Sequence, residues 1–193
     1  MQRQAGIFIG VVCAVMASTG TALAQLPAGD AAHDFAVGTA KNNLAEFSQA
    51  PVQLEVSAHR ESATVVTGHV RGYGDLNGDL AGGDFNVVGH VTCLRVDPKP
   101  DAAVTGPGAR ASIKYVVDNS SGPLAPPIGS VVEVFVEDNG PPRGGTPVDA
   151  NATLLPEPPE LSDARQCDDP LLGEPYNPVD QGDYVVNDAL DQP

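Results

Sequence analysis

Three histidines on segments of alternating polarity have a spacing that could build a metal site: His59, His69 and His90. Alternation with a period of two indicates β-strands, and each histidine falls on the polar side of its segment. A tight turn at residues 59–62 would place His59 about 23 Å from His69, because a strand rises about 3.3 Å per residue. His69 and His90 can still meet as cross-strand neighbours, but two histidines lack the third ligand that a zinc site needs. We therefore expect solvent-facing histidines, and we keep only His69 and His90 as metal candidates.

A second candidate for metal binding is a loop in which Asp75, Asn77 and Asp79 carry oxygen ligands at alternate positions. This spacing matches the beginning of a calcium-binding loop. Such a loop continues with glycine at its sixth position and an acidic residue at its twelfth, where this chain has leucine and asparagine. The surrounding Gly, Asp and Asn residues are typical of a hairpin loop. A plain loop is the preferred interpretation, and we expect no bound metal or other cofactor.

Glu133 and Glu137 form a pair of carboxylates on the polar side of one alternating segment, where they could act as a general acid and a general base. Their separation corresponds to about 13 Å along a strand, beyond the roughly 6.5–9.5 Å between the catalytic carboxyl groups of inverting glycosidases. A solvated face of the sheet explains them better. The sequence also contains no Gly-x-Ser-x-Gly motif and no glycine-rich phosphate loop between a strand and a helix. We therefore expect no catalytic residue and predict that the chain is not an enzyme.

The elements that would position these residues are short β-strands separated by Gly, Asp and Asn turns. In the segment 52–58, apolar residues alternate with polar ones, as on a half-buried strand. In the segment 85–93, the inward row ends at Cys93. The segments expected to form strands are residues 35–41, 52–58, 66–70, 85–93, 113–117 and 132–136. Six to seven strands without a convincing helix predict an all-β fold, a small antiparallel sandwich or barrel over residues 33–138.

The composition supports this fold class and limits the partners. The chain has 193 residues, of which 21 are glycine and 18 are proline, so long helices are disfavoured. A formal net charge of −15 argues against nucleic acid as a partner, because phosphate groups require a basic surface. Residues 139–193 hold 10 of the 18 prolines and 11 acidic residues. We expect this segment to be an extended Pro/acid-rich tail, pinned at Cys167 and dispensable for folding beyond it.

Residues 1–24 have the three parts of a secretory signal peptide. Arg3 provides a positive charge, an uncharged apolar run follows, and Ala22-Leu23-Ala24 has the small-x-small pattern of a cleavage site. The apolar run is shorter than the roughly 20 residues that span a bilayer. We therefore predict cleavage before Gln25, a flexible lead-in over residues 25–32, a secreted protein and no membrane span after cleavage. An uncleaved N-terminal anchor is the alternative.

Two cysteines, Cys93 and Cys167, remain after this cleavage, because Cys13 leaves with the signal peptide. An exported chain meets an oxidising environment, in which two cysteines commonly form one disulfide. Two free thiols or a pair of metal ligands are the alternatives, although neither cysteine has a second Cys or His near it at ligand spacing. A disulfide is the preferred interpretation.

The run Gly89-His90-Val91-Thr92-Cys93-Leu94-Arg95-Val96, followed by Asp138-Asn139-Gly140 and a later cysteine, resembles a loose group of small secreted actinobacterial proteins of unknown function. These proteins share a G-x-V-T-C-L-x-V core strand, a D-N-G turn and a C-terminal cysteine. The resemblance covers roughly residues 33–167. It implies an all-β fold and a bond between Cys93 and Cys167, and it implies no activity. The chain departs from the pattern after the core strand, at Asp97-Pro98-Lys99-Pro100, and in the acidic tail.

The function predicted from these observations is that of a secreted, non-catalytic β-domain that acts by binding or as a structural component of the extracellular or envelope space. The sequence does not identify its ligand or protein partner. A carbohydrate- or ligand-binding module is the alternative, for which Tyr73 and Tyr115 would have to be the aromatic platforms, because the chain has no tryptophan. A protease inhibitor built on the proline-rich residues 121–128 and a small hydrolase are further alternatives.

Overall fold

In the computed structural model the described residues are 33–42, 52–75, 84–98, 108–123, 125–140, 148–154, 156–170 and 176–189. The predicted signal peptide and the lead-in over residues 25–32 lie outside them. So do Asn77 and Asp79 of the candidate calcium loop, together with the side chain of Asp75.

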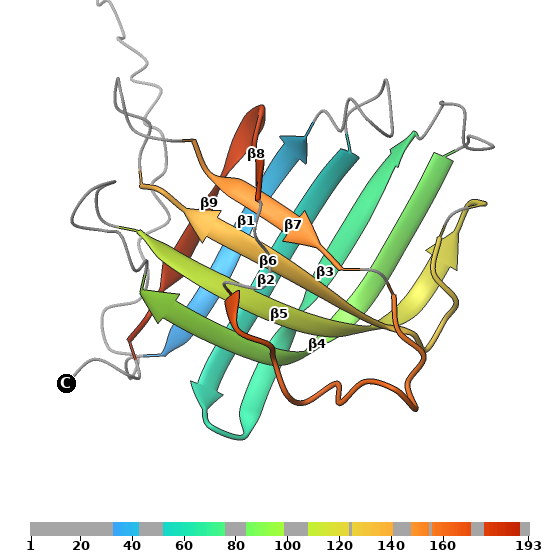
Figure 1. Cartoon of the computed structure of the whole chain (residues 1–193), viewed down its shortest axis with the longest axis horizontal. Coiled ribbons are helices and arrows are strands. Elements are labelled where there is room, and N and C mark those ends of the chain that lie inside the picture. Colours follow the sequence, from blue (N-terminus) through green and yellow to red (C-terminus); the bar gives the residue numbers. More distant parts are fainter. Residues whose placement is uncertain are drawn as a thin grey trace, which may run out of the picture. The chain divides into compact units, whose positions relative to one another are not determined.

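The described part of the chain contains nine strands, and all of them belong to one antiparallel sheet. The strands are β1 (Asp34–Asn42), β2 (Val52–Ser62), β3 (Val65–Asp75), β4 (Asp84–Pro98), β5 (Ala109–Ser121), β6 (Val131–Asp138), β7 (Ala150–Thr153), β8 (Asn177–Pro178) and β9 (Gln181–Asn187). Their order in the sheet is β8-β7-β6-β5-β4-β3-β2-β1-β9, and the sheet curls into a half-barrel (Figure 1). The described residues contain no helix, which confirms the predicted all-β class.

The curvature of the sheet comes largely from β4 and β5, which are long and strongly bent (Figure 1). The register between them shifts twice, between Val88 and Gly89 and between Val91 and Cys93. The first shift leaves Asp118 of β5 without a partner in the ladder, and the second does the same to Thr92 of β4. Each shift is a β-bulge, which bends a strand and increases its twist.

The inner face of the curled sheet carries the core, built mainly from small and β-branched side chains. Its buried members are Ala36, Ala40, Leu54, Val56, Ala58, Val70, Val87, Val91, Leu94, Val96, Ala111, Ile113, Tyr115, Val117, Val132, Val134, Val136, Val179, Tyr184 and Val186. Tyr184, Leu94 and Ile113 are among the largest side chains that are fully buried. The chain's own side chains therefore fill the inner face of the sheet.

The bulge at Thr92 corrects the inward row expected for β4. Val91 lies in the core as expected, but Leu94 and Val96 follow it instead of Cys93. One inserted residue shifts the two-residue alternation by one position, so Cys93 turns to the outer face. There it forms a disulfide with Cys167, with the two Cα atoms 5.6 Å apart.

One segment near the C-terminus supplies both edges of the sheet. β8 pairs with β7, and β9 pairs with β1 from Phe35–Asn187 to Lys41–Gln181. Between β8 and β9, Val179 N donates to the Asp149 carbonyl at 2.8 Å, and Asp180 N donates to the Lys41 carbonyl at 2.9 Å. The two ends of the curled sheet are therefore joined through residues 177–187.

These C-terminal strands correct the predicted extent of the fold. The sequence predicts six to seven strands over residues 33–138, but β7, β8 and β9 lie in the segment expected to be an extended tail. Tyr184 and Val186 of β9 are only 1% and 8% exposed and belong to the core. The expectation of an extended tail is therefore wrong for these strands, and their buried side chains argue against the prediction that residues beyond Cys167 are dispensable for folding. Proline and acidic residues dominate the composition of the segment and hide the short apolar alternation of β9.

Candidate functional site

The metal candidates His69 and His90 are cross-strand partners on β3 and β4, which confirms the expected pairing. His90 Nδ1 lies 2.8 Å from Asp118 Oδ1, and these two side chains are 55% and 51% exposed. Within the part of the chain that the structure describes, no three His, Cys, Asp or Glu side chains are grouped so that they could hold a metal ion. The geometry here is that of an exposed polar pair.

The expected turn at residues 59–62 is wrong, because β2 continues to Ser62 and the turn is formed by residues 63 and 64. His69 consequently pairs with Ser57, and His59 becomes its diagonal neighbour at about 7–8 Å instead of about 23 Å. The ring of His59 lies 5.8 Å from that of His33, measured between centroids. Burial, together with His33, lowers the pKa of His59.

The two tyrosines proposed as aromatic platforms have different surroundings. Tyr115 is 4% exposed and belongs to the core, so it cannot stack on a ligand. Tyr73 lies half-buried on β3, and the Arg71 guanidinium lies 4.5 Å from the centre of its ring. The Tyr73 hydroxyl donates to Glu55 Oε1 at 3.2 Å. Contacts within the sheet thus engage this ring, and they give the carbohydrate-binding alternative no support.

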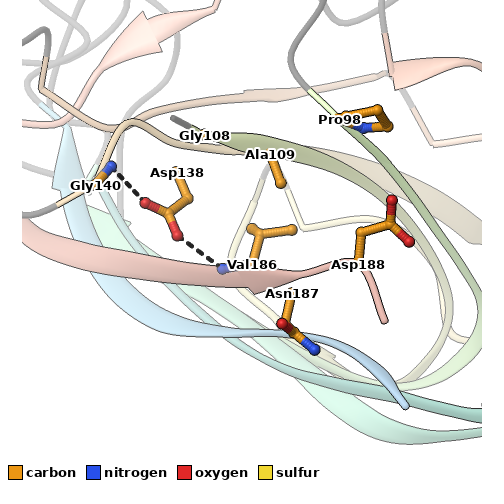
Figure 2. A pocket seen from close by; sticks show the side chains of 8 residues that line it. All are labelled: Pro98, Gly108, Ala109, Asp138, Gly140, Val186, Asn187 and Asp188. Carbon is orange, nitrogen blue, oxygen red and sulfur yellow. Dashed lines mark hydrogen bonds between the residues drawn. The ribbon is translucent and has the colours of Figure 1, made fainter. Parts of the chain in front are cut away.

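A pocket of about 330 Å³ opens where the C-terminal end of β6 meets β9, a contact that we call the seam (Figure 2). Its lining residues are Pro98, Gly108, Ala109, Asp138, Gly140, Val186, Asn187 and Asp188. Asp138 Oδ1 accepts a hydrogen bond from Gly140 N at 2.6 Å, and Oδ2 accepts one from Val186 N at 3.0 Å. The volume lies at the lower end of the range for small-molecule sites, which is about 300–1,000 Å³. Both carboxylate oxygens of Asp138 are, however, used in hydrogen bonds to backbone N–H groups, and these bonds connect β9 to the end of β6.

Asp149 makes a second tie across the same seam. Its Oδ2 accepts a hydrogen bond from Tyr184 N at 2.7 Å, and its Oδ1 accepts one from Asn139 N at 2.8 Å. Burial raises the pKa of Asp149 to about 6, and the neighbouring Asp183 carboxyl adds to the rise, while the two backbone N–H groups oppose it. Carboxylates thus satisfy N–H groups on the edge of β9 that faces away from β1, where a further strand would otherwise pair.

The raised pKa of Asp149 predicts that the protein gains stability as the pH falls from about 7 to about 5. The folded protein holds the proton more tightly than the unfolded chain, whose Asp pKa is 3.8, so this stabilisation is lost as the pH rises through about 6. Between pH 7 and pH 5 the gain is on the order of 1 kcal/mol, and the full effect, reached below the pKa of the unfolded chain, is on the order of 3 kcal/mol. Replacing the neighbouring acid, Asp183→Asn, should flatten this dependence and stabilise the protein at neutral pH. Thermal unfolding at constant ionic strength across this pH range measures both effects.

The matched control for this experiment is Glu160→Gln, which removes one exposed negative charge away from the seam. It separates the local effect from the general relief of repulsion in a chain of net charge −15. An Asp183→Asn variant whose pH dependence equals that of Glu160→Gln would contradict the assignment to Asp149.

Residues 156–170, which follow β7, lie along the outer face of β4, β5 and β6, and we call this segment the strap (Figure 1). Its ties to the sheet are the Cys93–Cys167 disulfide, the two 2.9 Å backbone hydrogen bonds between Glu157 and Val131, and the bond from Thr92 Oγ1 to the Ala164 carbonyl. Pro170 at its end is fully buried. The strap therefore turns part of the outer face into a second, covered layer.

Beside the strap, that outer face carries polar and charged side chains with only 0–7% exposure: Arg110, Ser112, Lys114, Glu133 and Glu137. Glu137 Oε2 accepts from Arg110 Nε at 2.7 Å. The expectation that Glu133 and Glu137 lie on a solvated face is wrong. Sequence alternation identifies the outer side of a strand, but it does not reveal that a later segment covers that side.

The centre of this covered layer is a group of three side chains around Lys114. Lys114 Nζ lies 3.6 Å from Glu133 Oε2 and 3.6 Å from Asp168 Oδ2. Glu133 Oε1 accepts hydrogen bonds from Ser112 Oγ and, at 2.9 Å, from Asp168 N. Burial raises the pKa of Glu133, and the Asp168 carboxyl adds to the rise, while the Ser112 bond and the Lys114 charge oppose it.

Sequence reasoning misses Lys114 and Asp168 as members of a site. The signal that could have found them combines two facts: Lys114 pairs with Cys93 in the β4–β5 register, and Asp168 follows Cys167. A Cys93–Cys167 bond then brings Asp168 beside Lys114. This register depends on the bulge at Thr92, and no local sequence pattern predicts that bulge.

Comparison with protein-family models, with curated proteins and with solved structures found no match. Among the described residues, no helix has the length and apolar character needed to cross a membrane.

Proposed function

We propose that this chain is an exported, non-catalytic β-domain that acts outside the cell by binding or as a structural component of the envelope space. The observation that carries the proposal is the pairing of buried carboxylates with arginines of the same fold: Asp34 with Arg60, and Glu137 with Arg110. Buried charges need such partners, and these partners come from within the fold. Groups used in this way serve the structure and do not face a substrate.

The export part of the proposal rests on the predicted signal peptide and on the disulfide. Structural disulfides persist in oxidising compartments and are rare in the cytosol. Cys93 and Cys167 are joined on the outer face of the sheet, where the bond anchors the strap. Because this disulfide holds the strap on the sheet, the protein is suited to a compartment in which disulfides are not reduced.

Expression of the full chain in a secreting host tests the proposal. We expect the exported protein to begin at Gln25 and to carry no thiol that can be alkylated before reduction. N-terminal sequencing, with mass analysis to allow for a cyclised Gln25, measures the first, and alkylation under native conditions measures the second. In the control variant Ala24→Arg, a large residue replaces the small one at the cleavage site, and processing should be blocked.

Two outcomes would contradict the proposal. The first is a soluble intracellular protein that begins at Met1 with Cys93 and Cys167 reduced. The second is hydrolysis of an ester, peptide or glycoside that survives purification and is abolished by one substitution in the covered layer.

A further inference from the structure

Lys114 faces two carboxyl groups at equal distance and is locked to neither. Both separations from Nζ are 3.6 Å, longer than the roughly 2.7–2.9 Å of a charge-assisted hydrogen bond. The Lys114 and Glu133 side chains are 9% and 4% exposed. Glu133 Oε2 is buried without a hydrogen-bond partner among the described residues. An ordinary buried ion pair would place these atoms at hydrogen-bonding distance, and this one does not.

The backbone holds the three side chains in place from both sides. Lys114 pairs with Cys93 on β4 and with Glu133 on β6, so it lies between them in the sheet. Cys93 is bonded to Cys167, which fixes Asp168 next to it, and Asp168 N donates to Glu133 at 2.9 Å. Holding two groups in contact replaces a bimolecular encounter, with effective concentrations of up to about 10⁵–10⁸ M in well-oriented cases.

We propose that Lys114 and Asp168 become joined by an intramolecular amide bond, with Glu133 as the group that transfers the proton. The lysine Nζ, as a neutral amine, attacks Cγ of the protonated Asp168 carboxyl group. Glu133 takes a proton from Nζ and delivers it to the departing oxygen of Asp168, which leaves as water. An amine and a carboxylic acid thus give an amide and one water, Glu133 ends as it began, and no atom is oxidised or reduced.

The surroundings favour this condensation. The Lys114 and Glu133 side chains are 9% and 4% exposed, so the site largely excludes the bulk water that would reverse the reaction by hydrolysis. The raised pKa of Glu133 lets this carboxyl group hold the proton that it must deliver. A cavity of about 20 Å³, lined in part by Lys114, Glu133 and Asp168, has room for the water that forms. Asp168 is 44% exposed, which gives that water a route to solvent.

The mass of the purified full chain decides the question. After complete reduction and unfolding, we expect the protein to be lighter than its sequence mass, corrected for signal cleavage, by one water, or about 18 Da. After proteolysis under reducing conditions, the peptides that contain Lys114 and Asp168 should remain joined. A folded, oxidised protein with its full sequence mass would overturn the proposal. Export and amide formation are measured separately, so failure of one does not imply failure of the other.

Two variants test the roles of the residues. Glu133→Gln keeps the shape of the side chain but not its proton transfer, and it should slow amide formation by at least roughly 100-fold. Lys114→Arg should abolish it. The control is Asp169→Asn, which changes the acid beside Asp168 that pairs with Arg95 and should leave the bond intact. Retention of the native disulfide in each variant shows that the chain has folded. Full amide formation in folded Glu133→Gln would remove Glu133 from the reaction.

Discussion

Deletion of residues 171–193 is expected to leave the chain unable to hold its sheet together. The deletion removes β8 and β9 and, with them, the buried side chains Val179, Tyr184 and Val186. At about 1.5–3 kcal/mol for each large apolar side chain, the loss is roughly 5–9 kcal/mol, comparable to the whole stability of a typical domain. It also leaves one edge of β1 unpaired and exposes its core residues. Loss of the cooperative thermal transition and rapid proteolysis should report the effect.

Deletion of residues 190–193 alone is the matched control, because it leaves every strand of the sheet in place. It should leave the melting temperature unchanged. If the protein that lacks residues 171–193 still unfolds cooperatively, with a melting temperature within a few degrees of that of the full chain, then β9 is not part of the stable core.

The variant Cys167→Ser is expected to lose about 2–4 kcal/mol of unfolding free energy. The disulfide joins residues 74 positions apart, and the chain-entropy model assigns roughly 4 kcal/mol to a loop of that size. The variant also removes one of the bonds that hold the strap over Lys114 and Glu133. Denaturant unfolding measures the loss through the midpoint and the slope of the transition.

The double variant Cys93→Ser/Cys167→Ser is the control for effects of the remaining thiol, and it should match the single variant. In the Lys114→Arg background the loss from Cys167→Ser should be larger. The loop closed by an amide between Lys114 and Asp168 overlaps most of the loop closed by the disulfide, so each bond partly replaces the other when both can form. An unchanged midpoint in all these variants would show that the strap contributes nothing to stability.

The strands over residues 33–138 could be predicted because their information is local. Each reveals itself by alternation over a few residues, and the pairing of His69 with His90 follows from the hairpin between β3 and β4. The sequence predicts the turn after β2 too early, because polar residues continue to Ser62 and the end of the strand leaves no clear signal. Local patterns thus predict that a strand exists better than they predict where it ends.

The C-terminal strands and the covered layer could not be predicted, because their information is distant in sequence. Tyr184 has room in the core because it pairs with Gly38, where an added Cβ would lie 2.8 Å from the Tyr184 Cα atom. Neither residue indicates the other locally. In the same way, Glu133 carries the signature of an exposed residue, and only the strap, fixed through Cys167, makes it buried.

The way in which residues 177–187 join both ends of the sheet also constrains the order of events when the chain folds. The contact between Ala189 N and Asp34 Oδ1 spans 155 positions of sequence. One edge of β1 therefore has no strand partner until β9 has been made. Such long-range pairings make folding slow, because the cost of closing the loop precedes the gain from the contacts. During N-to-C synthesis the partly made chain therefore stays open until β9 has emerged. The topology thus delays the finished fold until the last strand of the sheet has been made.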